Sequence, residues 1–405
     1  SSAQYNKTPV GLRIKMLLLR TWSSFFSAVL CITICITSGA SAEPENPSEF
    51  IAAVFRHGAR APLGTFLRDP NKGHHWQYGF GQLTKKGREE MYRLGRYFRK
   101  RYNQSLSDDP REVYARSSPE PRCFDSAALM LYGMYPANGA RRWKEGRDWQ
   151  PVPIVTLPKH NDKYTFNCPN MIQVALKALL SSGQGKAKDS PQNPIKSVAQ
   201  WTGISQEEPR KLLDALDALL VQHQNNLPLP AAVKGRLPIM SALTDKLYLL
   251  LGAALSPIMG GEILRDLAYR LQCFYNPEEK KIPDVMKQFA ALDIPANDVR
   301  KKKLYLYSYH DLNVVAVMHC LNNKTLKERP PYGSAVLFEV RKTDVSGGPV
   351  IQVLYRNGTQ NPFPVAITGC SSPCTLSAFS KFVNETFKPV TADQCGVGHP
   401  QFLVL

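Results

Sequence analysis

Short apolar runs alternate along the chain with longer stretches of helical periodicity. Residues 50–55, 113–115 and 304–308 are apolar runs of the kind that forms buried strands. Residues 84–102 repeat apolar side chains at helical spacing among Arg, Lys and Glu, which predicts a helix after the first strand. Because strands alternate with helices, we predict an α/β fold, a three-layer sandwich around a mostly parallel sheet.

The middle of the chain differs in composition and in hydrophobic pattern from the parts that flank it. Residues 141–235 carry many prolines and glycines with helical patches between them, and residues 241–275 have the pattern of one or two long amphipathic helices. Residues 335–355 are typical of a late hairpin that turns near Gly347-Gly348. We therefore expect a mostly helical cap inserted into the sandwich. The expected parts are the upstream residues and leader (1–42), the first part of the core (43–140), the cap (141–255) and the second part of the core (256–405).

A long uncharged segment lies near the beginning of the chain. Residues 21–42 contain no charged side chain and end in the small residues Ala40-Ser41-Ala42, which is typical of a secretory signal peptide. A membrane anchor is the alternative, since the segment has nearly the length of a span. Met16 would begin the leader, so residues 1–15 would be upstream sequence. No second long apolar span follows, so we expect a secreted protein, free of the membrane after cleavage, rather than a lysosomal one.

Composition and charge narrow the function classes. Hydrophobic residues make up 43% of the 405 residues and charged residues 21%, which permits a buried core and excludes global disorder. The formal net charge of +18 favours anionic partners. The basic residues are dispersed over short clusters, and no zinc-finger spacing, RNA-binding aromatic motif or basic helix is present. We therefore expect no nucleic acid among the partners.

Cysteines and glycosylation sequons agree with a secreted chain. Of the nine cysteines, Cys31 and Cys35 fall in the leader, and an odd number follows it. Cys370 and Cys374 are spaced for a small disulfide loop or for half of a zinc site. We favour the disulfide, and expect no metal, because no His or Cys pair lies at metal-ligand spacing. The sequons after the leader are Asn103, Asn323, Asn357 and Asn384.

The first predicted strand ends in a cluster of cations around a histidine. The sequence there is Arg56-His57-Gly58-Ala59-Arg60-Ala61-Pro62, in which Gly58 and Pro62 indicate a turn. Ligands bind at the carboxyl ends of strands in open α/β sheets, and guanidinium groups match phosphate oxygens. We interpret the motif as an anion pocket that holds a histidine. A surface turn with solvated arginines is the alternative.

This motif resembles the signature Arg-His-Gly-x-Arg-x-Pro of the histidine acid phosphatases, branch 2 of the histidine phosphatase superfamily. The resemblance extends in the family's order over about residues 48–396 and is strongest to the animal lysosomal and prostatic-type acid phosphatases. The other similar segments begin at Trp76, Tyr114, Tyr307, Pro330, Tyr355 and Gly369. The resemblance implies an enzyme that hydrolyses phosphate monoesters at acid pH without a metal or cofactor.

The resemblance also implies a role for each site residue. His57 would be the nucleophile that accepts the phosphoryl group, and Asp311 would protonate the leaving alcohol. The residues implied to bind the phosphate are Arg56, Arg60, Arg116 and His310. Three cations around His57 would lower its pKa, so that the imidazole stays neutral at acid pH.

Several positions depart from the family pattern. Ala59 and Asn313 are similar to phytase relatives. Residues 118–121 replace the usual Thr-Asp stretch, although Arg122 matches a later arginine of the family. The disulfides implied by the resemblance are Cys168–Cys395 and Cys370–Cys374, with Cys123, Cys273 and Cys320 unassigned.

Two alternatives to a secreted acid phosphatase stay open. A phytase-like inositol-phosphate phosphatase would line its cap pocket densely with Lys and Arg. A secreted binding protein with a decayed site would have lost motif residues, which are intact in this chain. Phosphoproteins are further candidate substrates beside small phosphate monoesters, and a homodimer is a candidate assembly, as in some relatives.

Overall fold

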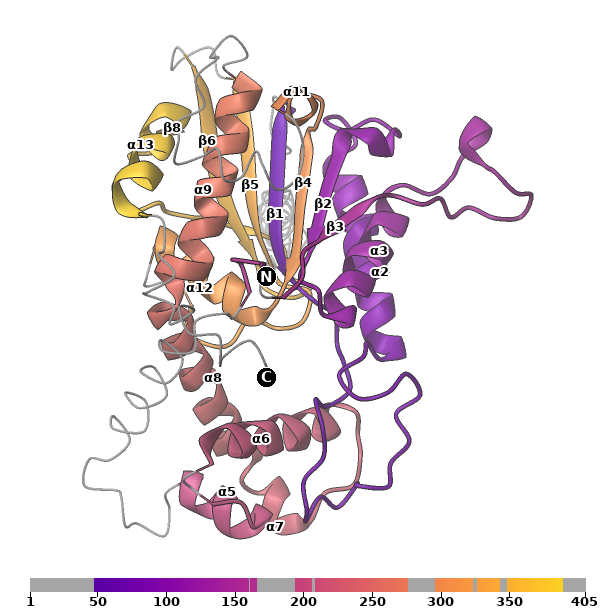
Figure 1. The fold of residues 1–405 in the computed structure, drawn as a ribbon, viewed down its shortest axis with the longest axis vertical. Helices are drawn as coiled ribbons and strands as arrows, with labels where there is room; N and C mark the ends of the chain where they lie inside the picture. The colour runs from indigo at the N-terminus through magenta and orange to yellow at the C-terminus, as the bar shows by residue number, and fades with distance from the viewer. Residues whose placement is uncertain are drawn as a thin grey trace, which may run out of the picture. The chain divides into compact units, whose positions relative to one another are not determined.

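The structure is a computed structural model that describes most of the chain after the predicted leader. The described residues are 47–159, 161–165, 194–205, 208–275, 296–322, 326–342 and 348–388. Figure 1 shows how their helices and strands are arranged. The predicted leader, Asn323, Cys168 and Cys395 lie outside the described residues, so the expectations for them stay predictions.

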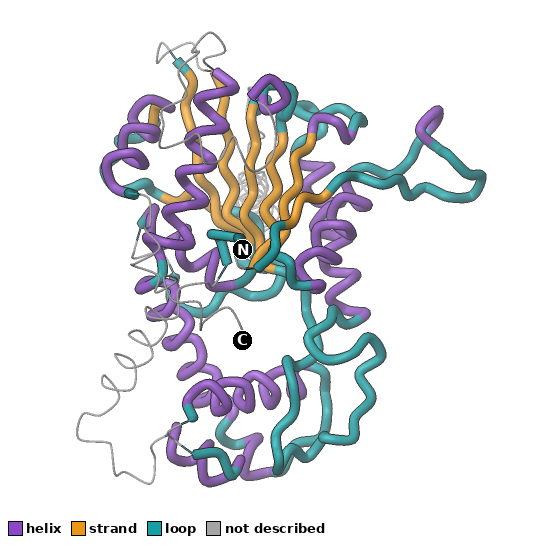
Figure 2. The backbone as a smooth tube through the Cα atoms, in the orientation of Figure 1, coloured by secondary structure: helices purple, strands orange, loops and turns teal. Residues whose placement is uncertain are grey.

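Within the described residues, one mixed sheet of eight strands forms the centre of the fold (Figure 2). The strands are β1 (Phe50–Arg56), β2 (Val113–Ser117), β3 (Ile154–Thr156), β4 (Leu304–Tyr309), β5 (Ala335–Lys342), β6 (Pro349–Arg356), β7 (Phe363–Val365) and β8 (Cys374–Thr375). Their order is β3-β2-β4-β1-β5-β6-β7, and β8 pairs with β6. β3, β2, β4 and β1 are parallel to one another, and all other pairs, including β1 with β5, are antiparallel. The predicted α/β fold around a mostly parallel core is confirmed, and the predicted hairpin is the β5–β6 pair.

Helices cover both faces of the sheet and complete the three layers. They are α2 (Lys85–Arg101) and α3 (Pro121–Met134) on one face, and α9 (Ser256–Tyr275), α12 (Asp311–Leu321) and α13 (Leu376–Thr386) on the other. Alternate residues of β1, such as Ile51 and Phe55, pack toward α2 and α3, while Phe50 and Val54 pack on the opposite face. Every residue of β1 is therefore buried, which explains why this strand is a continuous apolar run in the sequence.

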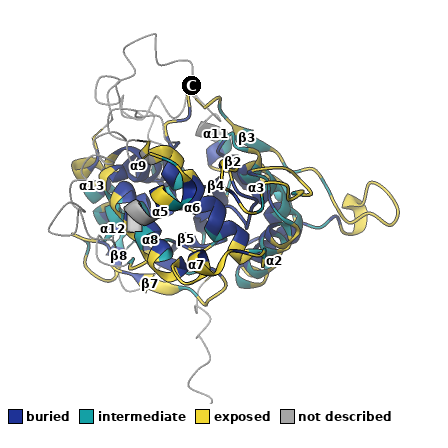
Figure 3. Cartoon of the chain, turned by 90° about the horizontal axis from the view of Figure 1, so that it is seen from below, coloured by how far each residue is buried: buried dark blue, intermediate teal, exposed yellow. Residues whose placement is uncertain are grey.

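Close helix packing fixes the layer formed by α2 and α3. The side chain of Thr84 accepts the N–H of Gly87 and caps α2, the helix predicted at residues 84–102. A Cβ on Gly95 would lie 2.0 Å from the carbonyl oxygen of Met130 in α3, so only glycine permits this approach. In Figure 3 the inward faces of the helices around the sheet are buried, and exposed positions lie on their outer faces.

A second group of helices lies in sequence between β3 and β4 and has its own apolar centre. Its members are α5 (Pro194–Thr202), α6 (Pro209–Gln224), α7 (Ala231–Lys234) and α8 (Leu237–Ala254). Leu216 and Leu219 of α6 pack with Val233 and Met240 in a cluster separate from those of the sheet. By length and composition α8 could cross a membrane, but it contacts α12 and α6 as a packed helix does. We call α5–α8 the cap helices; the division of the whole chain into core and cap at the expected boundaries stays a prediction.

The shorter elements and the surface positions complete the description. The short helices are η1 (Pro110–Glu112), η2 (Gly139–Arg141) and α11 (Ala296–Val299). Cys370 and Cys374 form a disulfide with a Cα–Cα distance of 5.4 Å, as the sequence predicts. Cys123, Cys273 and Cys320 are unpaired. Among the sequon residues, Asn103 and Asn384 are exposed and Asn357 is half-buried.

Candidate active site

Two parallel strands bring the two histidines together. In β1 and β4 Arg56 stands opposite Tyr309, so the residues that follow, His57 and His310, leave the sheet side by side. The backbone N–H of His57 donates to the carbonyl oxygen of Tyr309 at 3.0 Å. The two imidazole rings lie edge to face, 5.6 Å between centroids. The carboxyl edge of the parallel strands therefore carries the candidate site, as expected for an open α/β sheet.

The turn after β1 is seated on α2 by two glycines in contact. A Cβ on Gly58 would lie 2.4 Å from the carbonyl oxygen of Gly87, and a Cβ on Gly87 would lie 1.8 Å from that of Ala59. The backbone N–H of Ala59 donates to the carboxylate of Glu90 on the same helix at 2.9 Å. Because the turn cannot move without breaking these contacts, the direction of the His57 side chain is fixed.

The His57 imidazole has one nitrogen engaged by the backbone. Nδ1 lies 2.9 Å from the carbonyl oxygen of Gly58, and because a carbonyl only accepts, Nδ1 carries the proton. Nε2 then holds the lone pair. Burial lowers the pKa of His57 well below its ordinary value, and the charges of Arg122, Arg56, His310 and Arg60 lower it further. The lowered pKa favours the neutral ring in acid, and the lone pair of Nε2 is then available for nucleophilic attack.

Three guanidinium groups near His57 have buried donors without acceptors. Arg56, Arg60 and Arg122 each bury an Nε that has no hydrogen-bond partner within the described residues. Each of the three cations contributes to the lowered pKa of His57. A buried, unpaired donor on a charged group is costly unless a ligand satisfies it. Three positive charges around one imidazole are suited to an anion with several oxygens.

Asp311 is the first residue of α12 and has two arginine partners. Its Oδ2 accepts from Nη2 of Arg56 at 3.1 Å and from Nη2 and Nε of Arg329 at 2.6 and 2.7 Å. Its Oδ1 accepts from the N–H of Leu312 at 2.8 Å. Burial alone would raise the pKa of Asp311, but the charges of Arg329 and Arg56 outweigh it and hold that pKa far below the ordinary value. In this state Asp311 is a carboxylate.

Arg60 ties the turn to the cap helices. Nη1 and Nη2 of Arg60 donate to the two carboxylate oxygens of Asp217 on α6 at 2.9 and 2.8 Å. Both side chains are almost fully buried. The charge of Arg60 lowers the pKa of Asp217 although burial opposes the shift. A bidentate pair of this kind fixes both partners in orientation.

His310 contacts a side chain just after β2 and one from α3. Its Nε2 lies 3.1 Å from Oγ of Ser118, and the Sγ of Cys123 lies 3.8 Å from both ring nitrogens. Burial and the charge of Arg122 lower the pKa of His310 to about 3, while Asp311 opposes that shift. His310 is thus a neutral ring that can donate one hydrogen bond.

Tyr332 closes another side of the cluster. Its ring lies 4.0 Å from the guanidinium carbon of Arg56 and 5.7 Å from the ring of His57, centroid to centroid. An aromatic face against a guanidinium restrains it without consuming its hydrogen bonds. Arg56 also donates to the carbonyl oxygen of Pro330.

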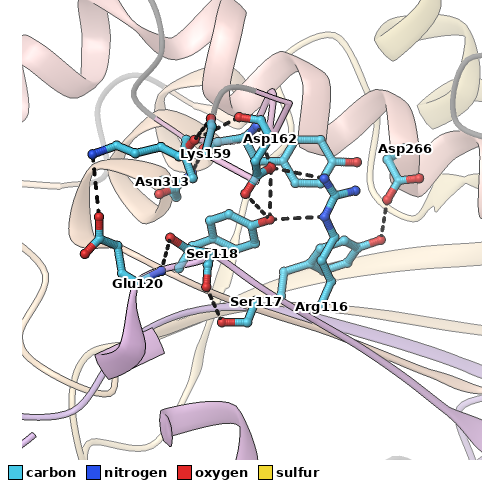
Figure 4. A network of polar contacts seen from close by, with 12 residues as sticks. Arg116, Ser117, Ser118, Glu120, Lys159, Asp162, Asp266 and Asn313 are labelled. Carbon is cyan, nitrogen blue, oxygen red and sulfur yellow. Dashed lines mark hydrogen bonds and ion pairs between the residues drawn. The ribbon is translucent and has the colours of Figure 1, made fainter. Parts of the chain in front are cut away.

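Arg116 lies in a different network from the other predicted site residues (Figure 4). Its Nη2 donates to Asp162 at 3.0 Å, its Nε donates to the hydroxyl of Tyr309 at 3.1 Å, and its guanidinium stacks 4.0 Å from the ring of Tyr164. It is not among the charges with the largest effects on the pKa of His57. The structure therefore groups Arg56, His57, Arg60, His310 and Asp311 but does not add Arg116 to them.

The network of Arg116 still reaches the site through backbone contacts. The side chain of Asn313 donates to the carbonyl oxygen of Tyr164, the residue stacked on Arg116, and accepts from the N–H of His310 at 3.2 Å. Arg116 thus supports the segment that orients His310.

Arg122, Arg329 and Asp217 are site residues that the sequence analysis did not assign to the pocket. Arg122 is the second residue of α3, shortly after the end of β2, and its position at a helix start near a strand end was the available signal. Arg329 and Asp217 come from a loop and a cap helix far away in sequence, and nothing local distinguishes them. Among the described residues, no group of three or more His, Cys, Asp or Glu side chains could hold a metal ion.

Comparisons with known proteins agree with this geometry. The family model described as histidine phosphatase superfamily (branch 2) matches residues 49–356. Prostatic acid phosphatase of Mus musculus is 27% identical over 93% of this chain and 96% of its own length, and lysosomal acid phosphatase of Bos taurus is 28% identical over 85% and 79%. The phytase from Citrobacter braakii superposes with a TM-score of 0.59 over 86% of this chain and 99% of its own, at 17% identity, which shows a common fold.

Proposed function

Because the chain belongs to branch 2 of the histidine phosphatase superfamily and is an acid phosphatase, we propose that it hydrolyses phosphate monoesters through a phosphohistidine at His57. The observation that carries the proposal is the neutral imidazole of His57 among the positive charges of Arg56, Arg60 and Arg122. A phosphate group brings several anionic oxygens that these guanidinium groups can bind.

The first step transfers the phosphoryl group to the protein. The lone pair of Nε2 of His57 attacks phosphorus while the ester P–O bond breaks, and the electron pair of that bond moves to the leaving oxygen. Asp311 takes up a proton from solvent when phosphate draws hydrogen bonds of Arg56 away from it, and gives this proton to the leaving oxygen, so an alcohol departs. The arginines stabilise the charge on the equatorial oxygens, which is the main contribution expected in phosphoryl transfer.

The second step releases phosphate. A water molecule attacks phosphorus, the N–P bond breaks and its electron pair returns to Nε2 of His57. Asp311, now a carboxylate, accepts the proton of the attacking water. The contacts of Asp311 with Arg56 and Arg329 in the free protein explain why it is stable as the carboxylate that this step needs.

We assign the third phosphate-binding arginine to Arg122 instead of Arg116. Arg122 is the arginine whose charge most lowers the pKa of His57, and its Nε lacks an acceptor within the described residues. Arg116 has Asp162 as a buried partner and acts at a distance. His310 keeps its proposed role as a donor to the phosphate.

Simple monoesters are a better fit than inositol polyphosphates. The cap residues that face the site arginines among the described ones are Asp217, Asp245 and Tyr248, not lysine or arginine. A phytase-like pocket would need dense positive charge there. Phosphoproteins stay candidate substrates, and a homodimer stays a candidate assembly.

We further propose that the protein is secreted. The disulfide Cys370–Cys374 and the exposed sequon residues Asn103 and Asn384 support an oxidising, glycosylating route. The relatives include prostatic and lysosomal enzymes, so the protein acts in a secreted or lysosomal setting, and the predicted leader favours the former.

A turnover assay tests the function directly. The purified protein is expected to release orthophosphate from glycerol 2-phosphate and p-nitrophenyl phosphate with an optimum in acid, and to prefer both over inositol hexakisphosphate. EDTA should leave the rate unchanged. Complete inactivity toward all three esters, with intact folding, would replace the proposal by the decayed binding protein. A preference for the hexakisphosphate would favour the phytase-like alternative.

A further inference from the structure

The position of Asp311 marks where a leaving alcohol must lie, and Arg329 is beside it. A general acid has to come within hydrogen-bond reach of the oxygen that it protonates. Nε and Nη2 of Arg329 lie 2.7 and 2.6 Å from Oδ2 of Asp311. Substituents on the first carbons of the leaving alcohol are therefore placed next to a guanidinium group, whatever the rest of the substrate is.

Arg329 is held in this position by contacts other than the carboxylate. Its guanidinium carbon lies 3.8 Å from the centre of the Tyr248 ring on α8. Its backbone N–H lies 3.4 Å from Oδ1 of Asp245 on the same helix. These contacts hold the cation on the cap side of the pocket, so it would stay there if Asp311 changed its bonding.

Arg329 has donor capacity that its protein contacts do not use. Both of its donors to Asp311 meet the same oxygen, Oδ2, and within the described residues no acceptor contacts Nη1. The side chain is 12% exposed, so an incoming group can reach it. Of the nearby carboxylates, Asp217 is already neutralised by the bidentate contact of Arg60. A planar guanidinium with an unused donor matches a carboxylate.

We propose that Arg329 is a specificity-determining residue that binds an anionic group on the leaving alcohol, so the preferred substrates are phosphate monoesters with a carboxylate next to the ester carbon. The inference rests on the proposed function, because it uses Asp311 as proton donor. Such an anion shares the guanidinium donors of Arg329 with Asp311 and adds negative charge beside Asp311. Both effects favour the protonated form of Asp311, which then passes its proton to the leaving oxygen as the P–O bond breaks.

Two esters with the same skeleton test the inference. In 2-phosphoglycerate a carboxylate replaces one hydroxymethyl group of glycerol 2-phosphate, so the ratio of their kcat/KM values isolates the anion. The wild type is expected to favour 2-phosphoglycerate. In Arg329→Met the ratio should fall about 10- to 100-fold, the size of one charge-assisted hydrogen bond. Arg329→Lys keeps the charge but not the planar guanidinium group, so its ratio should lie between those of the wild type and Arg329→Met.

The controls separate the possible causes of a change. Arg93→Met removes an exposed arginine on the outer face of α2 and should leave the ratio unaltered. Orthophosphate inhibition and thermal unfolding report whether the phosphate pocket of each variant is intact. If Arg329→Met does not fold, Arg329→Gln, which keeps a polar side chain at this position, takes its place.

The outcomes are distinguishable from failure of the proposed function. No turnover of either ester by the wild type would refute the phosphatase proposal itself. Turnover of both esters with a wild-type preference for glycerol 2-phosphate, or with the same ratio in wild type and Arg329 variants, would overturn the inference while the phosphatase function stands.

Discussion

Arg56 and Asp311 are in contact, with 3.1 Å between Nη2 and Oδ2, although they come from opposite ends of the described chain. The register of β1 and β4 explains the contact, because Arg56 stands opposite Tyr309, two residues before Asp311. The cation proposed to bind the phosphate thus also touches the proposed proton donor. When phosphate takes hydrogen bonds from Arg56, Asp311 loses part of the attraction that holds it ionised, so substrate binding itself prepares the acid.

His57→Ala should abolish turnover without unfolding the protein. His57 sits in the turn after β1, which is held by glycine contacts and by backbone bonds that the substitution leaves in place. Quenching turnover of a ³²P-labelled ester in alkaline denaturant should trap a base-stable label on the wild type only, and later acid treatment should remove it. Labelling of the His57→Ala protein to the same extent would show that another residue is the nucleophile.

Asp311→Asn should harm poor leaving groups most. Asparagine is similar in size but supplies no acidic proton, and general acid catalysis contributes roughly 10²–10⁴-fold. We expect kcat/KM to fall toward the upper end of that range for glycerol 2-phosphate, and clearly less for p-nitrophenyl phosphate, whose phenolate leaves without a proton. Equal fractional losses for both esters would contradict the leaving-group role and leave Asp311 as a structural residue at the start of α12.

Arg122→Met should mainly lower kcat/KM, whereas Arg116→Met should mainly lower the stability of the fold. Arg122 contributes to the charge around His57, so its loss should cost about 2–4 kcal/mol of transition-state stabilisation, by analogy with removal of an oxyanion donor. Arg116 is buried with Asp162, and its removal leaves an unpaired buried carboxylate that destabilises the fold by about 3–5 kcal/mol. Urea unfolding and kcat/KM of both variants make the comparison. A large rate loss in a fully stable Arg116→Met protein would return Arg116 to the pocket.

The free energy of unfolding should decrease as pH is lowered through the acid range, and His310 should account for part of this decrease. The pKa of His310 is lowered to about 3, mainly by burial, so between that value and the ordinary pKa of histidine the unfolded chain binds a proton that the folded chain does not. Stability from this residue is complete above the ordinary pKa and declines as pH falls through this window. The free energy of unfolding of His310→Gln should therefore depend less on pH than that of wild type between about pH 4 and pH 7. Parallel curves for the two proteins would show that His310 titrates normally.

The sequence was enough to predict the strands that carry the site, but not every residue that contributes to it. β1 and β4 are buried on both faces, so they stand out as apolar runs, and the residues after them are easy to place at one sheet edge. Arg116 was different, because it lies within β2 and its side chain joins Tyr309 and Tyr164 between the sheet and the neighbouring segments. A side chain near the end of a strand can point either toward the ligand or toward a packed helix layer. Which of the two occurs depends on the face of the sheet that the residue occupies, and the local sequence does not reveal that face.

Residues that reach the site from the cap and from loops could not be predicted for another reason. Asp217 is one of two acidic residues on the amphipathic helix α6, and Arg329 is one of several basic residues near a proline pair. Their roles arise from the way α6 and the segment before β5 approach the turn after β1, which is a long-range property of the fold. The disulfide Cys370–Cys374, by contrast, depends on a short loop and was predictable from spacing.

Because of the bidentate contact between Arg60 and Asp217, the affinity for the product phosphate and the position of the cap helices should depend on each other. Any phosphate that takes hydrogen bonds from Arg60 weakens the attachment of α6, and any displacement of α6 frees Arg60 for phosphate by the same factor in the equilibrium constant. Substitutions far from phosphorus, for example at the contact of Phe66, in the segment after β1, with Trp201 of α5, would then alter orthophosphate inhibition. The inhibition constant of the product becomes a reporter of how firmly the cap is seated.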